Sequence, residues 1–328
     1  MKTPHRPRRL LLALAAACVA APTAALAQAP AWPSRPVRIV VPTGPGSSLD
    51  LIVRAMSDKL AARWGQPVVV ENKPGAGGML GMDAVAKSTD GHTLGIGFNG
   101  PLAYAPFLYE KTPYDPARDL KPVVMTTSQP NVLAVNADVP ARTVAELVAW
   151  ARAQDGKVSY SSLGNGSSAH LTMELFLAEA GIKATHVPFN GSPPAAMAVA
   201  QGEAQMTFMV APAMLPHVQS RKARMLAVTS AQRPDSLKEL PPMAAAGYPK
   251  VESLAWNGLV GPASLPDAVA QRVAADVTAL LKDDAVLQLL DRSGLTPVGG
   301  TPAQFRQFIQ DDVQRWGPVI TRLGVRLN

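Results

Sequence analysis

Three glycine-rich turns hold the residues whose types and spacing best suit the binding of a small anion. They are Pro42–Ser48, Phe98–Pro101 and Ser161–Ser168, and none of them contains arginine or lysine. Glycine lets backbone N–H groups converge, serine adds hydroxyls, and a helix N-terminus adds partial positive charge. Such turns can therefore hold a carboxylate without a cationic side chain. The candidate binding residues are Thr43, Gly44, Gly46, Ser47, Asn99, Gly100, Ser162, Gly164, Asn165, Gly166 and Ser167.

An ordinary strand-to-helix connection is the simpler interpretation of any one of these turns, because glycine-rich turns are a weak signal. Their recurrence along the chain favours binding. Nucleotide motifs do not fit, since Leu49 stands where a dinucleotide fingerprint begun at Gly44 needs its third glycine. Pro74–Gly81 also lacks the Gly-Lys-Ser/Thr ending of a phosphate loop. The turns therefore do not predict a nucleotide site.

Catalytic and metal-binding patterns are weak. Gly166–His170 lacks the second glycine of a nucleophile elbow, and a serine and a histidine two residues apart do not easily form a triad hydrogen bond. We expect His170 to cap or to pack within its own part of the fold. His92, His186 and His217 are scattered singly, so we interpret them as structural or surface residues rather than metal ligands. The sequence predicts no enzyme activity, no metal and no cofactor.

Two further residues near the turns are candidates with an alternative role. Asp50 lies in the first turn of an expected helix, where it favours the helix dipole or hydrogen-bonds within the loop; direct contact with a ligand is the other option. Trp256 lies where its ring would face a cleft, and packing in the core explains it equally well.

The elements that must position these residues alternate between β-branched runs and amphipathic helical stretches. This alternation predicts an α/β fold with parallel sheets covered by helices on both faces. The expected strands are Val37–Val41, Val68–Val70, Thr93–Gly97, Pro122–Val135, Val158–Ser161, Ala184–Phe189, Gln205–Val210, Met225–Thr229 and Ser253–Gly261. The expected helices include Leu49–Trp64, Ser167–Ala180, Pro266–Lys282 and Pro302–Leu323.

The order of these elements predicts two α/β lobes joined by a two-strand hinge. We expect the chain to cross between lobes near residues 126–131 and 252–257, and Pro130 to break the first crossing stretch. Lobe 1 then comprises residues 28–128 and 256–328, and lobe 2 comprises residues 129–255. In such sheets ligands bind at the carboxyl ends of strands, which here means between the lobes.

The first residues have the order of a secretory signal, which predicts a signal peptide over residues 1–27. Met1–Arg9 is basic, Leu10–Ala21 is apolar, and Ala25–Ala27 is a small-x-small cleavage site. Without its four cations the formal net charge falls from +7 to +3, which removes the main support for nucleic-acid binding. Cys18 is the only cysteine, so the mature chain would carry no thiol. Twin-arginine export and lipidation of Cys18 stay open.

With these residues in place, the sequence resembles the receptors of tripartite tricarboxylate transporters, also called Bug receptors. The resemblance spans nearly the whole mature chain in family order. It is carried by Trp32-Pro33 through Val41-Pro42, Asn72–Gly78, Pro113–Pro116, Pro130–Leu133, Gly164–Gly166 with His170, Val187-Pro188, Leu215–His217, Leu226–Ser230, Trp256 with Gly258, and Pro297–Pro302.

This resemblance implies a type II periplasmic-binding-protein-like fold and a periplasmic, monomeric receptor that binds a small organic acid, often through bridging waters. It also implies delivery of the ligand to a small and a large integral-membrane transporter subunit, or signalling through a membrane sensor. The implied contacts are Thr43–Ser48, the turn after Gly97, Ser162–Ser168 with His170, and the region of Phe189. An exported hydrolase on the same scaffold, using Ser167 or Ser168, is the alternative from another class.

The sequence departs from the family pattern at several of these positions, so the ligand cannot be copied from a relative. The departures are Thr43 and Gly44 in place of an aromatic residue followed by a small residue or proline, Ser47 in place of glycine, Phe189-Asn190 in place of Tyr-Lys, and Ala198 and Met209 in place of aspartates.

Overall fold

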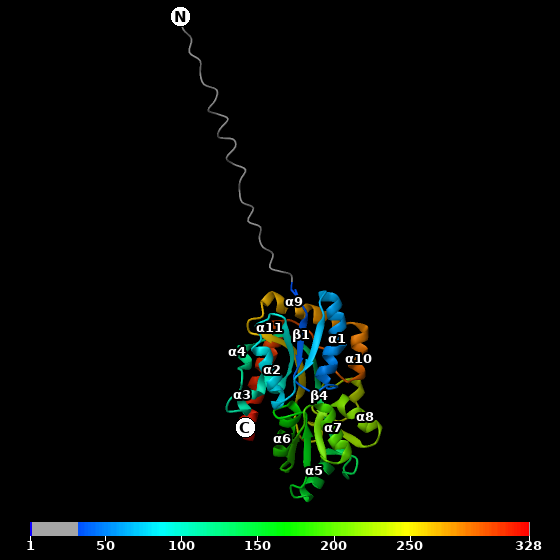
Figure 1. Cartoon of the computed structure of the whole chain (residues 1–328). Coiled ribbons are helices and arrows are strands. Elements are labelled where there is room, and N and C mark those ends of the chain that lie inside the picture. Colours follow the sequence, from blue (N-terminus) through cyan, green and yellow to red (C-terminus); the bar gives the residue numbers. More distant parts are fainter. Residues whose placement is uncertain (2–31, 328) are drawn as a thin grey trace.

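The structure, a computed structural model, describes Met1 and residues 32–327, which form two α/β lobes stacked one above the other (Figure 1). The fold prediction is confirmed. The predicted signal peptide, with Cys18, lies outside the described residues apart from Met1. None of the helices that the structure describes is long and apolar enough to cross a bilayer.

Lobe 1 is built on parallel strands. β1 pairs with β2 on one side and with β3 on the other, and β1 and β3 are apolar and buried, as expected of a sheet covered on both faces. Its elements are β1 (Val37–Val41), β2 (Val68–Asn72), β3 (Thr93–Phe98), α1 (Ser48–Trp64), α2 (Met79–Ala86), α3 (Ala105–Leu108), α4 (Pro116–Asp119), α9 (Asp267–Leu280), α10 (Asp284–Arg292) and α11 (Pro302–Leu323).

Lobe 2 repeats the same plan in the lower half of Figure 1. β5 pairs in parallel with β6 and β7, and helices cover the sheet. Its elements are β5 (Ser159–Ser162), β6 (Thr185–Pro188), β7 (Met206–Val210), β8 (Ala223–Val228), α5 (Val144–Ala153), α6 (Ser168–Ala180), α7 (Ser192–Gln201) and α8 (Ala211–Gln219).

Two antiparallel strands, β4 (Leu120–Asn136) and β9 (Leu254–Pro262), connect the lobes. β4 pairs with β9 as far as Pro130, and from Asn131 onward it pairs with β7. The expected break at Pro130 is wrong, because β4 runs through it without interruption. Pro130 stands where the strand changes neighbours, and there a missing backbone N–H is tolerated.

The long helices begin and end where their sequences specify. In α1, Ser47 Oγ accepts a hydrogen bond from the Asp50 N–H at 3.3 Å, and Gly65 ends the helix with φ +66°. Between these residues Ile52, Met56 and Leu60 are buried at helical spacing. The carboxyl ends of the strands and the starts of the helices thus fix the turns between them.

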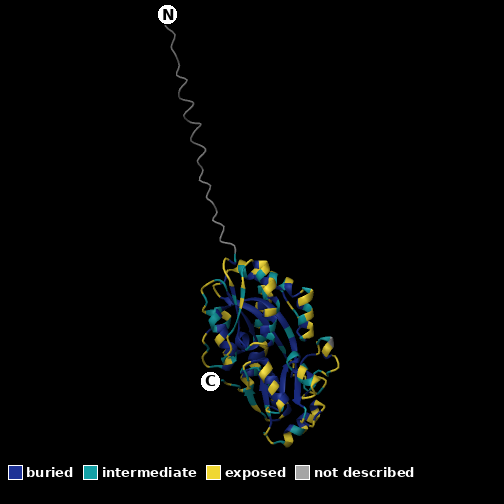
Figure 2. Ribbon diagram, turned by 45° about the vertical axis from the view of Figure 1, so that its right-hand side comes forward, coloured by how far each residue is buried: buried dark blue, intermediate teal, exposed yellow. Residues whose placement is uncertain are grey.

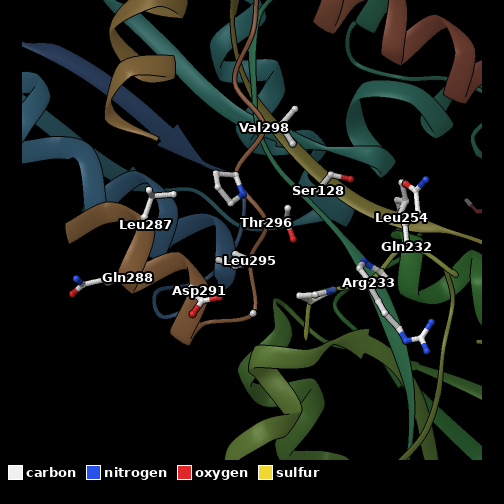
Figure 3. A pocket seen from close by; sticks show the side chains of 14 residues that line it. Ser128, Gln232, Arg233, Leu254, Leu287, Gln288, Asp291, Leu295, Thr296 and Val298 are labelled. Carbon is white, nitrogen blue, oxygen red and sulfur yellow. The ribbon is translucent and has the colours of Figure 1, made fainter. Parts of the chain in front are cut away.

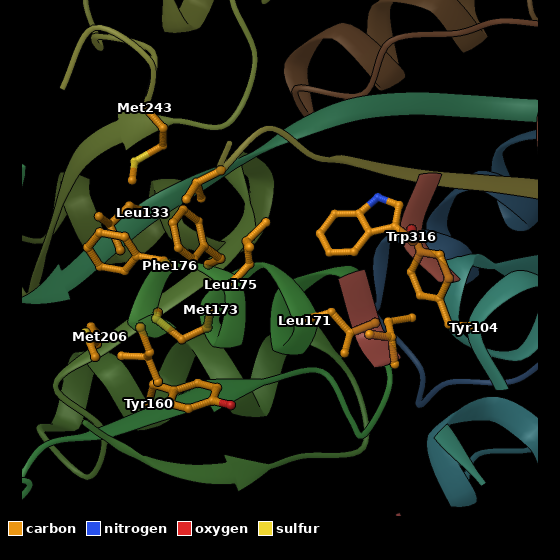
Figure 4. Close-up of a cluster of buried hydrophobic side chains, with 14 of the residues drawn as sticks. Tyr104, Leu133, Tyr160, Leu171, Met173, Leu175, Phe176, Met206, Met243 and Trp316 are labelled. Atoms are coloured by element: carbon orange, nitrogen blue, oxygen red, sulfur yellow. The ribbon is translucent and has the colours of Figure 1, made fainter. Parts of the chain in front are cut away.

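Most strands lie inside the molecule, β2 and β6 are partly exposed, and the outer faces of the helices are exposed (Figure 2). One cluster of buried side chains is shared by both lobes (Figure 4). It extends from Phe176 and Met206 in lobe 2, through Leu171, to Tyr104 and Trp316 in lobe 1. The lobes are therefore in contact away from the hinge as well as through it.

Candidate functional site

The predicted turns of the two lobes face one another across a narrow cavity. Thr43 lines it from lobe 1, and Gly164, Phe189 and Asn190 line it from lobe 2. The cavity measures about 10 Å³, which is about what one water molecule requires. A small organic acid needs more room, so the lobes must separate for such a ligand to enter.

The closest contacts between the lobes at this cavity are between backbone atoms. The Gly44 N–H of lobe 1 donates to the Asn190 carbonyl of lobe 2 at 3.3 Å. A Cβ at Gly77 would lie 2.4 Å from the Asn165 carbonyl oxygen, and one at Gly100 would lie 3.0 Å from that of Gly166. Glycine at these lobe 1 positions is thus what permits this closeness.

The lobe 1 turn is organised by its own polar side chains. Thr43 Oγ1 and Ser47 Oγ are 2.6 Å apart. Asp50, which is 4% exposed, accepts hydrogen bonds from the Gly46 N–H at 3.0 Å and from Arg54 Nε at 2.9 Å. Burial alone would raise the pKa of Asp50, but the hydrogen bonds from Arg54, Gly46 and Asn72 outweigh it and hold the pKa below its usual value. Asp50 thus stabilises the turn and does not line the cavity.

The lobe 2 turn is organised in the same way, with a histidine in the place of the carboxylate. His170 Nδ1 accepts the Gly166 N–H at 3.1 Å, and Ser162 Oγ accepts the Gly164 N–H at 3.1 Å. Ser167 Oγ caps α6 by accepting the His170 N–H at 3.3 Å. Gly164 and Gly166 adopt φ +135° and +73°, backbone conformations that favour glycine.

The glycine N–H groups expected to hold an anion are therefore already paired. Those of Gly46, Gly164 and Gly166 bond within their own lobes. The bond of Gly44 crosses to the other lobe, so opening of the lobes would free that group. Thr43 and Ser47 add hydroxyls beside it at the start of α1.

Of the predicted residues, Thr43, Gly164, Phe189 and Asn190 line the cavity and the others do not. Asn99, Trp256 and Met209 have other partners within the protein. Asn99 Nδ2 donates to Tyr104 Oη at 3.0 Å, and its Oδ1 accepts the Trp256 N–H at 3.2 Å. Trp256 is 1% exposed; its Nε1 donates to Asp312 Oδ2 at 2.8 Å, and its ring packs edge-on against two phenylalanines of α11. Met209 is fully buried among apolar side chains of lobe 2. Gly100, which follows Asn99, does reach the contact between the lobes.

Sequence reasoning missed some of the cavity wall. Phe98 and Leu163 line it; both lie in predicted turns but were not among the individual candidate residues. Leu163 packs against the buried clusters of both lobes. Gly75, Gly77 and Gly78 line it as well. The signal for these glycines lies in Pro74–Gly81, a stretch that fails as a phosphate loop but is rich enough in glycine to permit a close approach. Nothing in the sequence marks Leu163 as a residue that bridges the lobes.

A wider cavity of about 730 Å³ lies beside the hinge (Figure 3). Leu287 and Leu295 line it from lobe 1, Arg233 lines it from lobe 2, and Ser128 and Leu254 belong to the connecting strands. None of the predicted binding residues lines it. Its size therefore does not make it the candidate site. Within residues 32–327, no group of three or more His, Cys, Asp or Glu side chains gathers as a metal site would require.

Comparisons with known proteins agree with the two-lobed α/β fold. Residues 52–325 match the family model described as the tripartite tricarboxylate transporter family receptor. Protein BugT of Bordetella pertussis is 35% identical over 321 residues, covering 97% of this chain and 98% of that protein. The structure of R. palustris Rpa4515 with adipate has a TM-score of 0.86 at 33% identity, covering 90% of this chain and 100% of that one. The structure of MatC from Rhodopseudomonas palustris with bound malate has a TM-score of 0.83 at 28% identity, covering 88% and 100%.

Proposed function

Because this chain belongs to the tripartite tricarboxylate transporter receptor family, we propose that it captures a small organic carboxylate between its two lobes and presents it to membrane partners. The observation that carries the proposal is the narrow cavity between the Thr43–Ser48 turn and the Ser162–Ser168 turn. Each turn ends at the N-terminus of a long helix, α1 or α6, where partial positive charge favours an anion.

The first binding contact in this proposal is the N–H of Gly44. When the lobes open, the Asn190 carbonyl leaves this group, and a ligand carboxylate takes its place together with the Thr43 and Ser47 hydroxyls. The body of the ligand then lies against Phe98 and the lobe 2 side chains of the cavity wall. The adipate and the malate in the two solved neighbours belong to the same chemical class.

The partners in this proposal are a small and a large integral-membrane transporter subunit, and the receptor acts as a monomer in the periplasm. A membrane sensor is the alternative partner, because a signalling receptor would use the same ligand site. Export after removal of residues 1–27 places the receptor there. A mature N-terminus at Gln28 in the secreted protein, determined by mass spectrometry, supports this step, and retention of residues 1–27 would contradict it.

The test of the ligand class compares acids with their uncharged relatives. We expect a panel of aromatic, short aliphatic, di- and tricarboxylic acids to contain compounds that raise the melting temperature, because a ligand at about a thousand times its Kd adds roughly 4 kcal/mol of stability. The amide or methyl ester of each hit should bind at least tenfold more weakly, since charge-assisted hydrogen bonds are lost. Equal affinity of acid and amide would contradict the proposal, and so would hydrolysis of the ester.

A further inference from the structure

Two histidines from distant parts of the sequence stack beneath the lobe 2 turn. The rings of His170 in α6 and His186 in β6 lie 4.0 Å apart, centroid to centroid, at an interplanar angle of 8°. The ring of Tyr160 in β5 stacks on His186 at 4.8 Å and 17°. Tyr160 and His186 are direct neighbours in the parallel register of β5 and β6. The sequence alone predicts a scattered surface or structural residue at His186, whereas the structure places it under the turn.

Each histidine is connected to a glycine of the turn. His170 Nδ1 accepts the Gly166 N–H at 3.1 Å. His186 Nε2 lies 2.7 Å from Ser162 Oγ, and this oxygen accepts the Gly164 N–H at 3.1 Å. Ser162 Oγ also donates to the Gly164 carbonyl oxygen at 3.1 Å, so the tautomer of His186 decides whether its Nε2 donates to Ser162 Oγ or accepts from it. His170 Nδ1 acts as an acceptor, and this requires an uncharged ring.

The surroundings of the two rings keep them uncharged. Burial lowers the pKa of His170 to about 3, with the adjacent His186 adding to the shift. Burial also lowers the pKa of His186 to about 4. On the far side of the stack, Tyr160 donates its hydroxyl hydrogen to Glu174 Oε1 of α6. The base of the stack is thereby tied to the same helix that carries His170.

The position of this turn matters because lobe 1 approaches it closely. A Cβ added to Gly77 of lobe 1 would lie 2.4 Å from the Asn165 carbonyl oxygen. The Gly166 carbonyl oxygen faces Gly100 of lobe 1. A shift of the turn towards lobe 1 would therefore press these oxygens against the Gly77 and Gly100 backbone, and a shift away would separate the lobes at this point. The hydrogen bonds from the stack fix the residues on both sides of Asn165.

We propose that His170 and His186 are positioning residues for ligand capture, which hold the Gly164–Gly166 turn in its binding shape through their uncharged rings. They act through the turn and do not line the cavity. Their effect on the shape of the turn does not depend on a ligand. Their effect on ligand affinity rests on the proposed function.

Amide hydrogen exchange of the full mature chain tests the first claim without a ligand. His170→Phe and His186→Phe keep a stacked ring but remove the ring nitrogens that contact the Gly166 N–H and Ser162 Oγ. We expect each to speed exchange in the 162–168 segment by about tenfold, the factor that follows from one lost hydrogen bond of ordinary strength. His170→Asn keeps an acceptor near the Nδ1 position and should restore most of the protection. His217→Ala, in α8 and outside the stack, is the matched control and should exchange like the wild type.

Unchanged exchange in the Phe variants would overturn the proposal, and so would a His170→Asn variant that exchanges as fast as His170→Phe. If a Phe variant fails to fold, as judged by circular dichroism, the comparison of His170→Asn with the wild type still decides the matter. Calorimetric titration with adipate tests the second claim, with about a tenfold weaker Kd expected for the Phe variants and rescue by His170→Asn. Failure of wild-type protein to bind any acid counts against the proposed function and leaves the exchange result standing.

Discussion

At the scale of single residues, the site is shaped by buried acceptors that bind backbone N–H groups. Asp50 accepts a hydrogen bond from the Gly46 N–H, His170 accepts one from the Gly166 N–H, and Ser162 accepts one from the Gly164 N–H. A buried N–H without a partner would cost about 1–3 kcal/mol, so these side chains stabilise the fold as well as the shape of the turns. The polar side chains near the cleft thus form hydrogen bonds mainly within the protein, and few of their hydrogen-bonding groups are available to a ligand.

The uncharged histidines predict a loss of stability in acid. The unfolded chain takes up protons near the ordinary histidine pKa of 6.5, whereas folded His170 and His186 resist protonation down to about 3 and about 4. Below about pH 6.5 the unfolded state therefore binds more protons, and the free energy of unfolding falls as the pH is lowered, by at most about 1.4 kcal/mol per pH unit for each histidine.

Urea unfolding at pH 7, 5.5 and 4.5 measures this effect. A His170→Asn/His186→Gln double variant lacks both titrating rings and should show a clearly shallower loss of stability over this range than the wild type. Carboxyls with lowered pKa values, such as Asp50 and Asp90, also contribute to acid sensitivity. They are common to both proteins and cancel in the comparison. Parallel pH curves for the two proteins would contradict the prediction.

Residue chemistry alone predicted the turns on both sides of the cavity but could not assign roles to their residues. Glycine and serine in turns after strands predicted Thr43, Gly164 and the helix start at Ser167, since these depend on local sequence. The contribution of His186 depends on strand pairing with Tyr160, which no local pattern reveals. Trp256 was ambiguous for the same reason, because its partners lie on α11, far along the chain.

At the scale of elements, hydrogen bonds to α11 attach the connecting strand β9 to lobe 1. Asp312 Oδ2 on this helix accepts hydrogen bonds from Trp256 Nε1 and Tyr104 Oη, each at 2.8 Å, and a longer one from Asn99 Nδ2 at 3.4 Å. Burial raises the pKa of Asp312, although these donors oppose the shift. The carboxylate thus joins β9 and the turn after β3 to α11.

Removal of this carboxylate should destabilise the protein strongly. In Asp312→Leu, the hydroxyl of Tyr104 and the ring N–H of Trp256 lose their acceptor, so we expect a loss of roughly 3 kcal/mol or more. The adjacent Asp311 is exposed and its side chain accepts a hydrogen bond from Gln307 Nε2. Asp311→Leu should change stability by less than about 1 kcal/mol. Denaturant midpoints of the two variants provide the measurement. Similar midpoints would show that the network contributes little.

Most of the elements follow from the sequence where a regular pattern is long enough. The buried strand Val37–Val41 and the helix ending at Trp64 match their predicted positions. α10 was not predicted, because it is short and buries only two residues, Val286 and Leu290. The continuity of β4 through Pro130 was also missed, since tolerance of proline depends on which neighbours the strand has at that point.

At the scale of the whole molecule, the described arrangement is the closed one. Backbone contacts join the lobes at Gly44, Gly77 and Gly100, and a shared buried cluster joins them through α11 and α6. The binding of a ligand between such lobes requires opening and reclosing about the two connecting strands. Closure is therefore the step on which single residues at the contact should act.

Gly77→Ala should obstruct closure. Its Cβ would lie 2.4 Å from the Asn165 carbonyl oxygen of the other lobe, and φ at this residue is +62°. Gly181→Ala is the matched control, because Gly181 has φ +61° and a Cβ added there would meet nothing within 4 Å. Both variants carry the same backbone strain of about 1–2 kcal/mol, but only the first interferes with the lobe contact.

Small-angle scattering with and without a saturating acid from the panel measures closure. Wild-type protein and Gly181→Ala should become more compact on binding, whereas Gly77→Ala should stay expanded and bind at least tenfold more weakly. A wild-type profile that does not change with a bound ligand would rule out closure as the capture mechanism. Equal compaction of both glycine variants would show that the Gly77 contact is dispensable.

The antiparallel pairing of β3 with β9 also has a consequence for the order of folding. Gly95 pairs with Val260, so the lobe 1 sheet is completed by a strand made about half the chain later. Lobe 2 draws most of its sheet from a continuous stretch and has the lower contact order, which favours its earlier formation. Until β9 arrives, β3 presents an unpaired edge, a known template for intermolecular strand pairing. The nascent chain therefore passes through an aggregation-prone stage that ends when about its last quarter, which begins with β9, docks.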